Sequence, residues 1–188
     1  MFSLEQVQKG GAVFDIEKLK WLNKEHRKLL PEDEQNAYIL SSLAPYPALQ
    51  TILSQAPTAL EDLRDRYTTT HELVDAIEAG EYNFFTTKPE LTTEKLLWRK
   101  DPSKENTLTR LTHVSTLLTA VPPEHFSHDA VEACLDTYAE AEGKGNVLWP
   151  LRYALSGVDR SPNPYVLLEA LGKEESLQRI QTAQELLQ

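Results

Sequence analysis

Two arginines stand close together in a stretch rich in proline and glycine, residues 145–164. Arg152 lies in a short apolar segment, and Arg160 lies in the connector between Gly157 and Pro162. A guanidinium group presents five N–H donors in a flat fork and is costly to bury without a flat acceptor partner. A rigid loop that carries two such groups is therefore suited to recognising a planar, acceptor-rich ligand.

The turn residues of this stretch predict how the chain holds the two arginines. Pro150 is expected at the first position of a helix, where a missing N–H costs nothing. Gly157 is expected to end that helix as a left-handed cap. Asn163 and Pro164 are expected to begin the next helix. Arg152 would then lie in the helix before a tight connector over residues 159–164, and Arg160 would lie within that connector.

Three segments carry a resemblance to bacterial glutamyl-tRNA synthetases, and they occur in the order that the family has. Residues 150–179 resemble its C-terminal end, which runs P-L-R-x-A-L-[ST]-G, then a Ser/Thr-Pro turn, then L-G-K-E-x-[ST]-L-x-R. Residues 13–23 are similar to its F-D-x-x-K-L-x-W-x-N segment, and residues 64–69 to its R-x-R-[FY]-x-T. The chain is thus identified as resembling the C-terminal, anticodon-binding portion of a glutamate–tRNA ligase.

The resemblance implies that the chain reads the anticodon of a tRNA. Anticodon bases are unpaired, so they can be stacked on side chains and read on their polar edges. In the family, the arginine matching Arg66 is implicated at the first anticodon base, where it helps to distinguish glutamate tRNA from glutamine tRNA. The residues matching the P-L-R arginine and the Ser/Thr-Pro turn are implicated at the second and third bases. The expected tRNA-binding residues are Arg66, Arg152, Arg160, Ser161, Pro162 and Pro164, together with Lys18, Trp21 and Asn23 in the N-terminal match.

Each of these residues also has a structural interpretation. Arg152 can form an internal salt bridge with Glu169 or Asp159, because buried arginines usually pair. Arg66 can be a helix-end charge that complements the helix dipole. The lysines around Lys18 can form a solvated helix face, and Trp21 can be a core residue. Pro164 stands where the family commonly has leucine, so its contact is the least supported by the resemblance.

Helical periodicity runs through almost the whole chain, so the predicted fold class is all-α. Asp15 is expected to cap a helix that carries Ile16, Leu19 and Leu22 on one face. The resemblance implies two consecutive helical-bundle subdomains of short helices, of the class I synthetase anticodon-binding type. Residues 1–88 would hold the end of the stem-contact region and the first subdomain, and residues 89–188 the second.

Motifs for catalysis are missing from the 188 residues. There is no glycine-rich phosphate loop and no nucleophile motif. His125, His128 and Cys134 lack a fourth ligand and the tight spacing of a zinc site, so no metal is expected. The family's H-I-G-H and K-M-S-K-S signatures are absent, so ATP and Mg belong to the catalytic domain of the parent enzyme. We therefore expect no catalytic residue or cofactor in this chain, which should be inactive alone.

The net charge of −10 argues against a nucleic-acid binder, because phosphate contacts normally supply much of the affinity. Residues 143–188 hold five basic and five acidic side chains, so residues 1–142 carry the whole −10. An acidic helical module that docks a protein and never touches RNA is therefore the alternative function. The expected partners are the anticodon arm of tRNA(Glu) and the enzyme's catalytic domain, without DNA.

The composition also predicts where the protein works. No signal peptide is recognisable at the N-terminus, and no stretch approaches the ~20 apolar residues that span a bilayer. The single cysteine, Cys134, excludes an internal disulfide. We therefore expect a cytoplasmic protein without a membrane partner.

Overall fold

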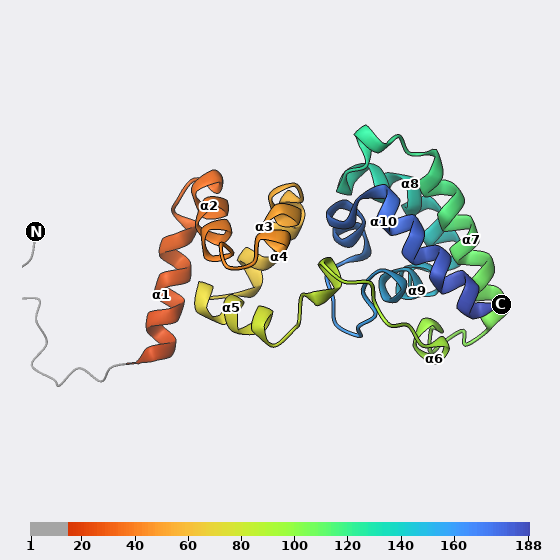
Figure 1. Cartoon of the computed structure of the whole chain (residues 1–188), viewed down its shortest axis with the longest axis horizontal. Coiled ribbons are helices and arrows are strands. Elements are labelled where there is room, and N and C mark those ends of the chain that lie inside the picture. Colours follow the sequence, from red (N-terminus) through yellow and green to blue (C-terminus); the bar gives the residue numbers. More distant parts are fainter. Residues whose placement is uncertain (1–14) are drawn as a thin grey trace, which may run out of the picture.

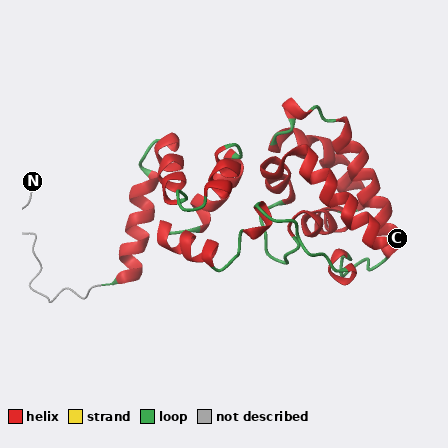
Figure 2. Ribbon diagram, in the orientation of Figure 1, coloured by secondary structure: helices red, strands yellow, loops and turns green. Residues whose placement is uncertain are grey.

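The computed structural model describes residues 15–188, and these residues form helices and connecting loops (Figures 1 and 2). The N-terminal half holds α1 (Ile16–Lys28), α2 (Glu32–Ser42), α3 (Pro47–Ser54), α4 (Pro57–Arg66) and α5 (Thr70–Glu78). The C-terminal half holds α6 (Thr93–Leu96), α7 (Lys104–Ala120), α8 (His128–Glu142), α9 (Lys144–Ser156) and α10 (Pro164–Leu187). Two 3₁₀ turns, η2 (Asn83–Phe85) and η3 (Pro123–His125), lie in the connections. Within residues 15–188 there is no β-strand, which confirms the predicted all-α class.

Polar side chains cap several of these helices, and Asp15 and Asn163 do so where the sequence predicts. The carboxylate of Asp15 accepts the N–H of Lys18 at 3.1 Å and caps α1. Thr69 and Glu72 form a reciprocal capping box at the start of α5. Ser103 caps α7, and the Asn163 side chain accepts the Tyr165 N–H at 3.0 Å to begin α10. These caps satisfy N–H groups that have no partner inside a helix.

The C-terminal half is a bundle in which α10 packs against α7, α8 and α9 (Figure 1). Its core consists of fully buried apolar side chains from all four helices: Leu111, Leu118, Leu135, Leu151, Leu155, Leu167 and Ile180. Gly172 has a positive φ of 73° and breaks α10 into two helical segments. Glycine adopts such a backbone conformation without steric cost, which allows the break at this position.

Pro150 corrects one sequence prediction, because it lies inside α9 rather than at its first position. The helix already begins at Lys144, with Gly143 as its N-cap residue. Proline has no N–H to donate to the carbonyl four residues earlier, which weakens a helix interior. Here Pro150 is buried in the bundle beside Leu151, so packing outweighs that loss.

Helix α1 packs against its neighbours through polar rather than apolar side chains. Arg27 is buried and Lys20 pairs with Glu72 at 3.0 Å, whereas Ile16, Leu19 and Leu22 are exposed. Trp21 is 56% exposed, so its interpretation as a core residue is wrong. The side of α1 that faces the rest of the chain carries hydrogen-bond donors for the end of α4. The last carbonyl groups of a helix need such donors, because they have no partner within the helix.

The two halves touch through α10, which contacts α3 and α4. Glu169 on α10 accepts the Thr58 N–H at the start of α4 and the His128 N–H at the start of α8, at 3.2 and 3.1 Å. The predicted boundary between residues 88 and 89 falls in the connector between η2 and α6, and it remains a prediction. Across residues 15–188, no helix is both long and apolar enough to cross a membrane.

Candidate nucleic-acid interface

Arg152 lies on the last turns of α9 with its guanidinium group held by a main-chain carbonyl. Its Nη2 donates to the Asp159 carbonyl oxygen at 3.1 Å, and no carboxylate among residues 15–188 forms an ion pair with it. The predicted carboxylate partners are engaged elsewhere. Asp159 pairs with Lys95 at 3.1 Å, and Glu169 accepts the Thr58 and His128 N–H groups. The salt-bridge interpretation of Arg152 is therefore wrong, because no acidic side chain of residues 15–188 accepts from its guanidinium group.

The loop after α9 is held in place by Ser156, a buried residue that the sequence analysis did not single out. Its hydroxyl donates to the Arg152 carbonyl oxygen at 2.8 Å and lies 3.2 Å from the Ser161 hydroxyl. Gly157 follows with a φ of 69°, and a Cβ there would lie 2.5 Å from the Cβ of Pro89. The loop therefore rests directly on the connector between the two halves, which fixes its shape.

The structure brings the predicted residues of this stretch to one corner of the C-terminal bundle. Pro162 and Pro164 are buried, whereas Arg160 is exposed and makes no ion pair in the described chain. Ser161 is half-buried, and Pro164 lines the same shallow hollow as Arg152. The guanidinium groups of Arg152 and Arg160 are therefore attached to a rigid stretch of backbone.

Two tryptophans that were not predicted complete this corner. Trp98, in the turn after α6, and Trp149, on α9, have ring centroids 5.4 Å apart and planes inclined by 44°. The Arg152 guanidinium lies over the Trp149 ring at 4.9 Å, and that of Arg99 lies over the Trp98 ring at 5.5 Å. Trp149 directly precedes the P-L-R segment, and this position in the sequence could have indicated that Trp149 lies beside Arg152.

Arg66 lies in the other half of the molecule, at the end of α4. Its Nη2 is 3.0 Å from the Asp62 carboxylate, and its Nη1 donates to the Tyr82 hydroxyl at 3.4 Å. The side chain is 38% exposed, so this ion pair sits at the surface. Burial raises the pKa of Asp62, although the positive charge of Arg66 opposes that rise. Arg66 does not line the hollow that contains Arg152.

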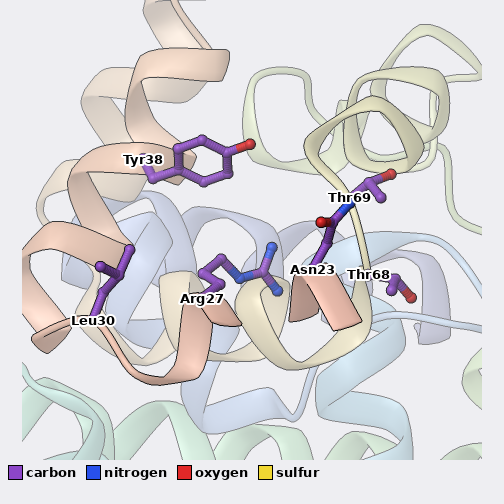
Figure 3. A pocket seen from close by; sticks show the side chains of 6 residues that line it. All are labelled: Asn23, Arg27, Leu30, Tyr38, Thr68 and Thr69. Carbon is purple, nitrogen blue, oxygen red and sulfur yellow. The ribbon is translucent and has the colours of Figure 1, made fainter. Parts of the chain in front are cut away.

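The residues of the N-terminal match lie on α1. Lys18 and Trp21 are exposed, and Asn23 lines a hollow of about 270 Å³ with Arg27, Leu30, Tyr38, Thr68 and Thr69. Figure 3 shows the Arg27 guanidinium between Tyr38 and Asn23. Its Nη2 donates to the Arg64 and Tyr67 carbonyl oxygens, both at 2.8 Å, and burial lowers the pKa of Arg27. Arg27 thus caps the end of α4 while Asn23 stays accessible.

Within residues 15–188, one group of side chains comes close enough to share a cation: His128, Asp129 and Glu132. The His128 Nδ1 is already 3.1 Å from an Asp129 carboxylate oxygen, and both acidic residues are exposed. Exposed acidic groups gather in this way without an ion, so we assign no metal here. The absence of a metal site remains a prediction.

Comparison with known proteins connects this geometry to a family. The anticodon binding domain family matches residues 18–184. The glutamate–tRNA ligase of Chloroherpeton thalassium is 35% identical over 193 residues, which cover 97% of this chain and 37% of that protein. The glutamate–tRNA ligase of Clostridium kluyveri is 32% identical, over 96% of this chain and 36% of that protein. The crystal structure of a glutamate tRNA ligase from Elizabethkingia meningosepticum superposes with a TM-score of 0.70 at 25% identity, covering 100% of this chain and 36% of that one.

The chain therefore belongs to the anticodon binding domain family. Within that family it corresponds to the C-terminal portion of glutamate–tRNA ligases, as its three sequence segments predict. It spans a little over a third of the length of the relatives that it matches.

Proposed function

We propose that this chain binds the anticodon arm of tRNA(Glu) and reads its unpaired bases on behalf of a glutamate–tRNA ligase. The observation that supports this most is the state of Arg152. Its guanidinium group is fixed by a backbone carbonyl and by the Trp149 ring, and no carboxylate neutralises it within the described chain. An arginine held in this way can place two donors on one base edge.

The loop beside Arg152 supplies the rest of the reading surface. Ser161 is half-buried and Pro164 lines the hollow beside Arg152, on a backbone that Ser156 and Gly157 hold rigid, and the buried Pro162 stiffens the turn between them. We assign Arg152 and this loop to the second and third anticodon bases, and Arg66 to the first. Arg160 is placed to contact a nearby phosphate, because it is exposed and makes no ion pair with the described residues.

The charge distribution favours RNA binding by one part of the surface and not by the chain as a whole. The chain carries a net charge of −10, yet residues 143–188 are neutral. We therefore expect weak binding by this chain alone, with a marked dependence on salt. Lys18, Trp21 and Asn23, at the far end of the N-terminal half, would contact another part of the same tRNA.

The exposed apolar side chains of α1 fit a second partner, the catalytic domain of the longer enzyme. Ile16, Leu19 and Leu22 on this helix are 58%, 43% and 37% exposed, and Leu29, directly after its last residue, is 79% exposed. Apolar patches of this kind usually mark an interaction surface. Aminoacylation with ATP and Mg would belong to that larger enzyme. Changing Leu19 and Leu22 together to lysine should weaken the association of this chain with a separately produced catalytic domain, while its helical content stays the same; unchanged association would contradict this contact.

The proposal is tested by a gel shift with an unmodified tRNA(Glu) transcript and an anticodon-swapped transcript, across a salt series. We expect the cognate transcript to bind more tightly, and binding of both to weaken as salt rises. Equal affinity for the two transcripts would contradict anticodon reading. A folded chain that retains no RNA at low salt would favour the alternative of an acidic protein-interaction module.

A further inference from the structure

The pair formed by Trp98 and Trp149 is a built feature rather than two chance surface residues. Trp98 comes from the turn after α6 and Trp149 from α9, 51 positions later in the chain. A Cβ on Gly145 would lie 2.8 to 3.0 Å from three atoms of the Trp98 ring. Glycine at residue 145 therefore lets the indole lie directly on the backbone of α9. The Nε1 of Trp149 donates to the Lys95 carbonyl oxygen at 2.9 Å, which fixes the second ring.

The pair borders a shallow, mostly apolar hollow of about 280 Å³ that also involves Lys144, Leu148, Arg152 and Pro164. This volume lies just below the roughly 300–1,000 Å³ of pockets for drug-sized ligands. The hollow is open, so it suits one flat group that remains part of a larger molecule. Both indoles are half-buried, which leaves part of each ring accessible.

Positive charge surrounds the hollow in an otherwise acidic chain. Arg99 and Arg152 lie over the two rings and form no ion pair with a carboxylate among residues 15–188. Lys144 also lines the hollow, although Asp136 and Glu140 pair with it at 2.9 and 3.5 Å. Lys95, whose carbonyl oxygen holds Trp149, pairs with Asp159 at 3.1 Å. Aromatic rings combined with unneutralised arginines are the usual means of holding unpaired bases and their phosphates.

We propose that Trp98 and Trp149 form a stacking site for one unpaired base of a bound RNA. This inference rests on the proposed function, because the base would neighbour those whose edges Arg152 and the following loop read. Stacking uses the face of a base, which every base has, so this site adds affinity without selecting sequence. The two parts of the surface therefore have different roles. The loop selects which bases bind, and the tryptophan pair contributes part of the binding free energy for any base.

The test compares Trp98→Leu and Trp149→Leu with the unchanged chain in binding to tRNA(Glu) and to the anticodon-swapped transcript. We expect each variant to lose about 5- to 150-fold in affinity, equally for both transcripts, which is the scale of one stacked base. Phe126→Leu is the matched control, because Phe126 is a half-buried aromatic residue in the connection before α8 and does not line the hollow. It should change affinity less than twofold.

A second measurement keeps the proposal testable if a leucine variant is unstable. Trp149→Phe retains an aromatic ring, so it should recover most of the affinity. In a Trp21→Phe background, the remaining emission comes from Trp98 and Trp149, and RNA binding should quench it in proportion to occupancy. If the wild-type chain binds tRNA but the folded leucine variants bind equally well and no quenching occurs, the stacking site is wrong. If the wild-type chain binds no tRNA at all, both the proposed function and this inference are wrong.

Discussion

Arg179 on α10 donates from its Nη1 to the main-chain carbonyl oxygen of Leu155 at 2.6 Å, one residue before the serine that holds the loop after α9. The same guanidinium bonds the carbonyl oxygens of Phe84 at 2.6 Å and Thr87 at 3.2 Å, both in the connector between the halves. The side chain is only 3% exposed, and its Nε donates to Glu175 at 2.7 Å. One buried arginine thus ties α10, the connector and the end of α9 together.

Replacing Arg179 by methionine should lower the free energy of unfolding by about 3 kcal/mol or more, because two buried carbonyl groups and a third, partly buried one lose their donor. Arg179→Lys should recover part of the loss, since an ammonium group can reach some of the same oxygens. Chemical denaturation measures both values. Arg160→Met is the control and should stay within about 0.5 kcal/mol, as expected for an exposed side chain. Equal stability of the Arg179→Met and Arg160→Met variants would contradict the structural role of Arg179.

Alanine substitutions at Gly157 and Gly172 distinguish the cost of backbone strain from the cost of a steric clash. Both have positive φ, 69° and 73°, but a Cβ on Gly157 would meet Pro89 at 2.5 Å, whereas one on Gly172 would meet no atom within 4 Å. Alanine at residue 172 should cost about 1 kcal/mol from strain alone. Alanine at residue 157 should cost clearly more and should also weaken tRNA binding, because the loop must move. The comparison is made by thermal unfolding and gel shift, and equal losses in stability would refute the contact with Pro89.

Arg152→Lys should weaken binding of tRNA(Glu) by ~1–3 kcal/mol, the scale of one bidentate base contact. Lysine keeps the positive charge, so the slope of affinity against salt should stay nearly unchanged. Filter binding at several salt concentrations measures both quantities. A parallel fall for the anticodon-swapped transcript would indicate a general phosphate contact, and unchanged affinity would remove Arg152 from the reading surface.

Arg66→Gln in the full-length ligase should increase charging of glutamine tRNA relative to glutamate tRNA, because the fixed donor at the first base is lost. Asp62→Asn is the matched control, since it removes the ion pair at 3.0 Å but keeps the arginine. Charging rates with both tRNAs decide the matter. If the Arg66→Gln variant keeps the same selectivity between the two tRNAs, Arg66 only complements the dipole of α4 and does not read the first base.

Glu72 should make stability depend on acid pH. Its carboxylate pairs with Lys20 at 3.0 Å and accepts the Thr69 and Thr68 N–H groups, and these contacts lower its pKa below 4.5 in the folded state. The unfolded chain then binds the proton more tightly. The stabilisation is therefore complete above the unfolded pKa and is lost as pH falls through the folded one. In the Glu72→Gln variant, the melting temperature should change less with pH between about pH 5 and 3 than it does in the wild-type chain. The same dependence on pH in both would contradict this.

The sequence alone determined the all-α class, the family and several helix ends, because these depend on local signals. Asp15, Asn163 and Gly157 each act through the backbone within a few residues, so their roles can be recognised without knowing the fold. The motif P-L-R likewise marked Arg152 before its surroundings were known.

Only the tertiary structure decided which partners meet across long stretches of the chain. It gave Arg152 a backbone carbonyl as its partner in place of the carboxylate that the alternative interpretation required, and it brought Trp98 against Gly145 and Trp149. It also turned the apolar side chains of α1 outward, where periodicity alone could show only that they share a face. Periodicity gives the direction of side chains around one helix, whereas burial depends on which other helices pack against it.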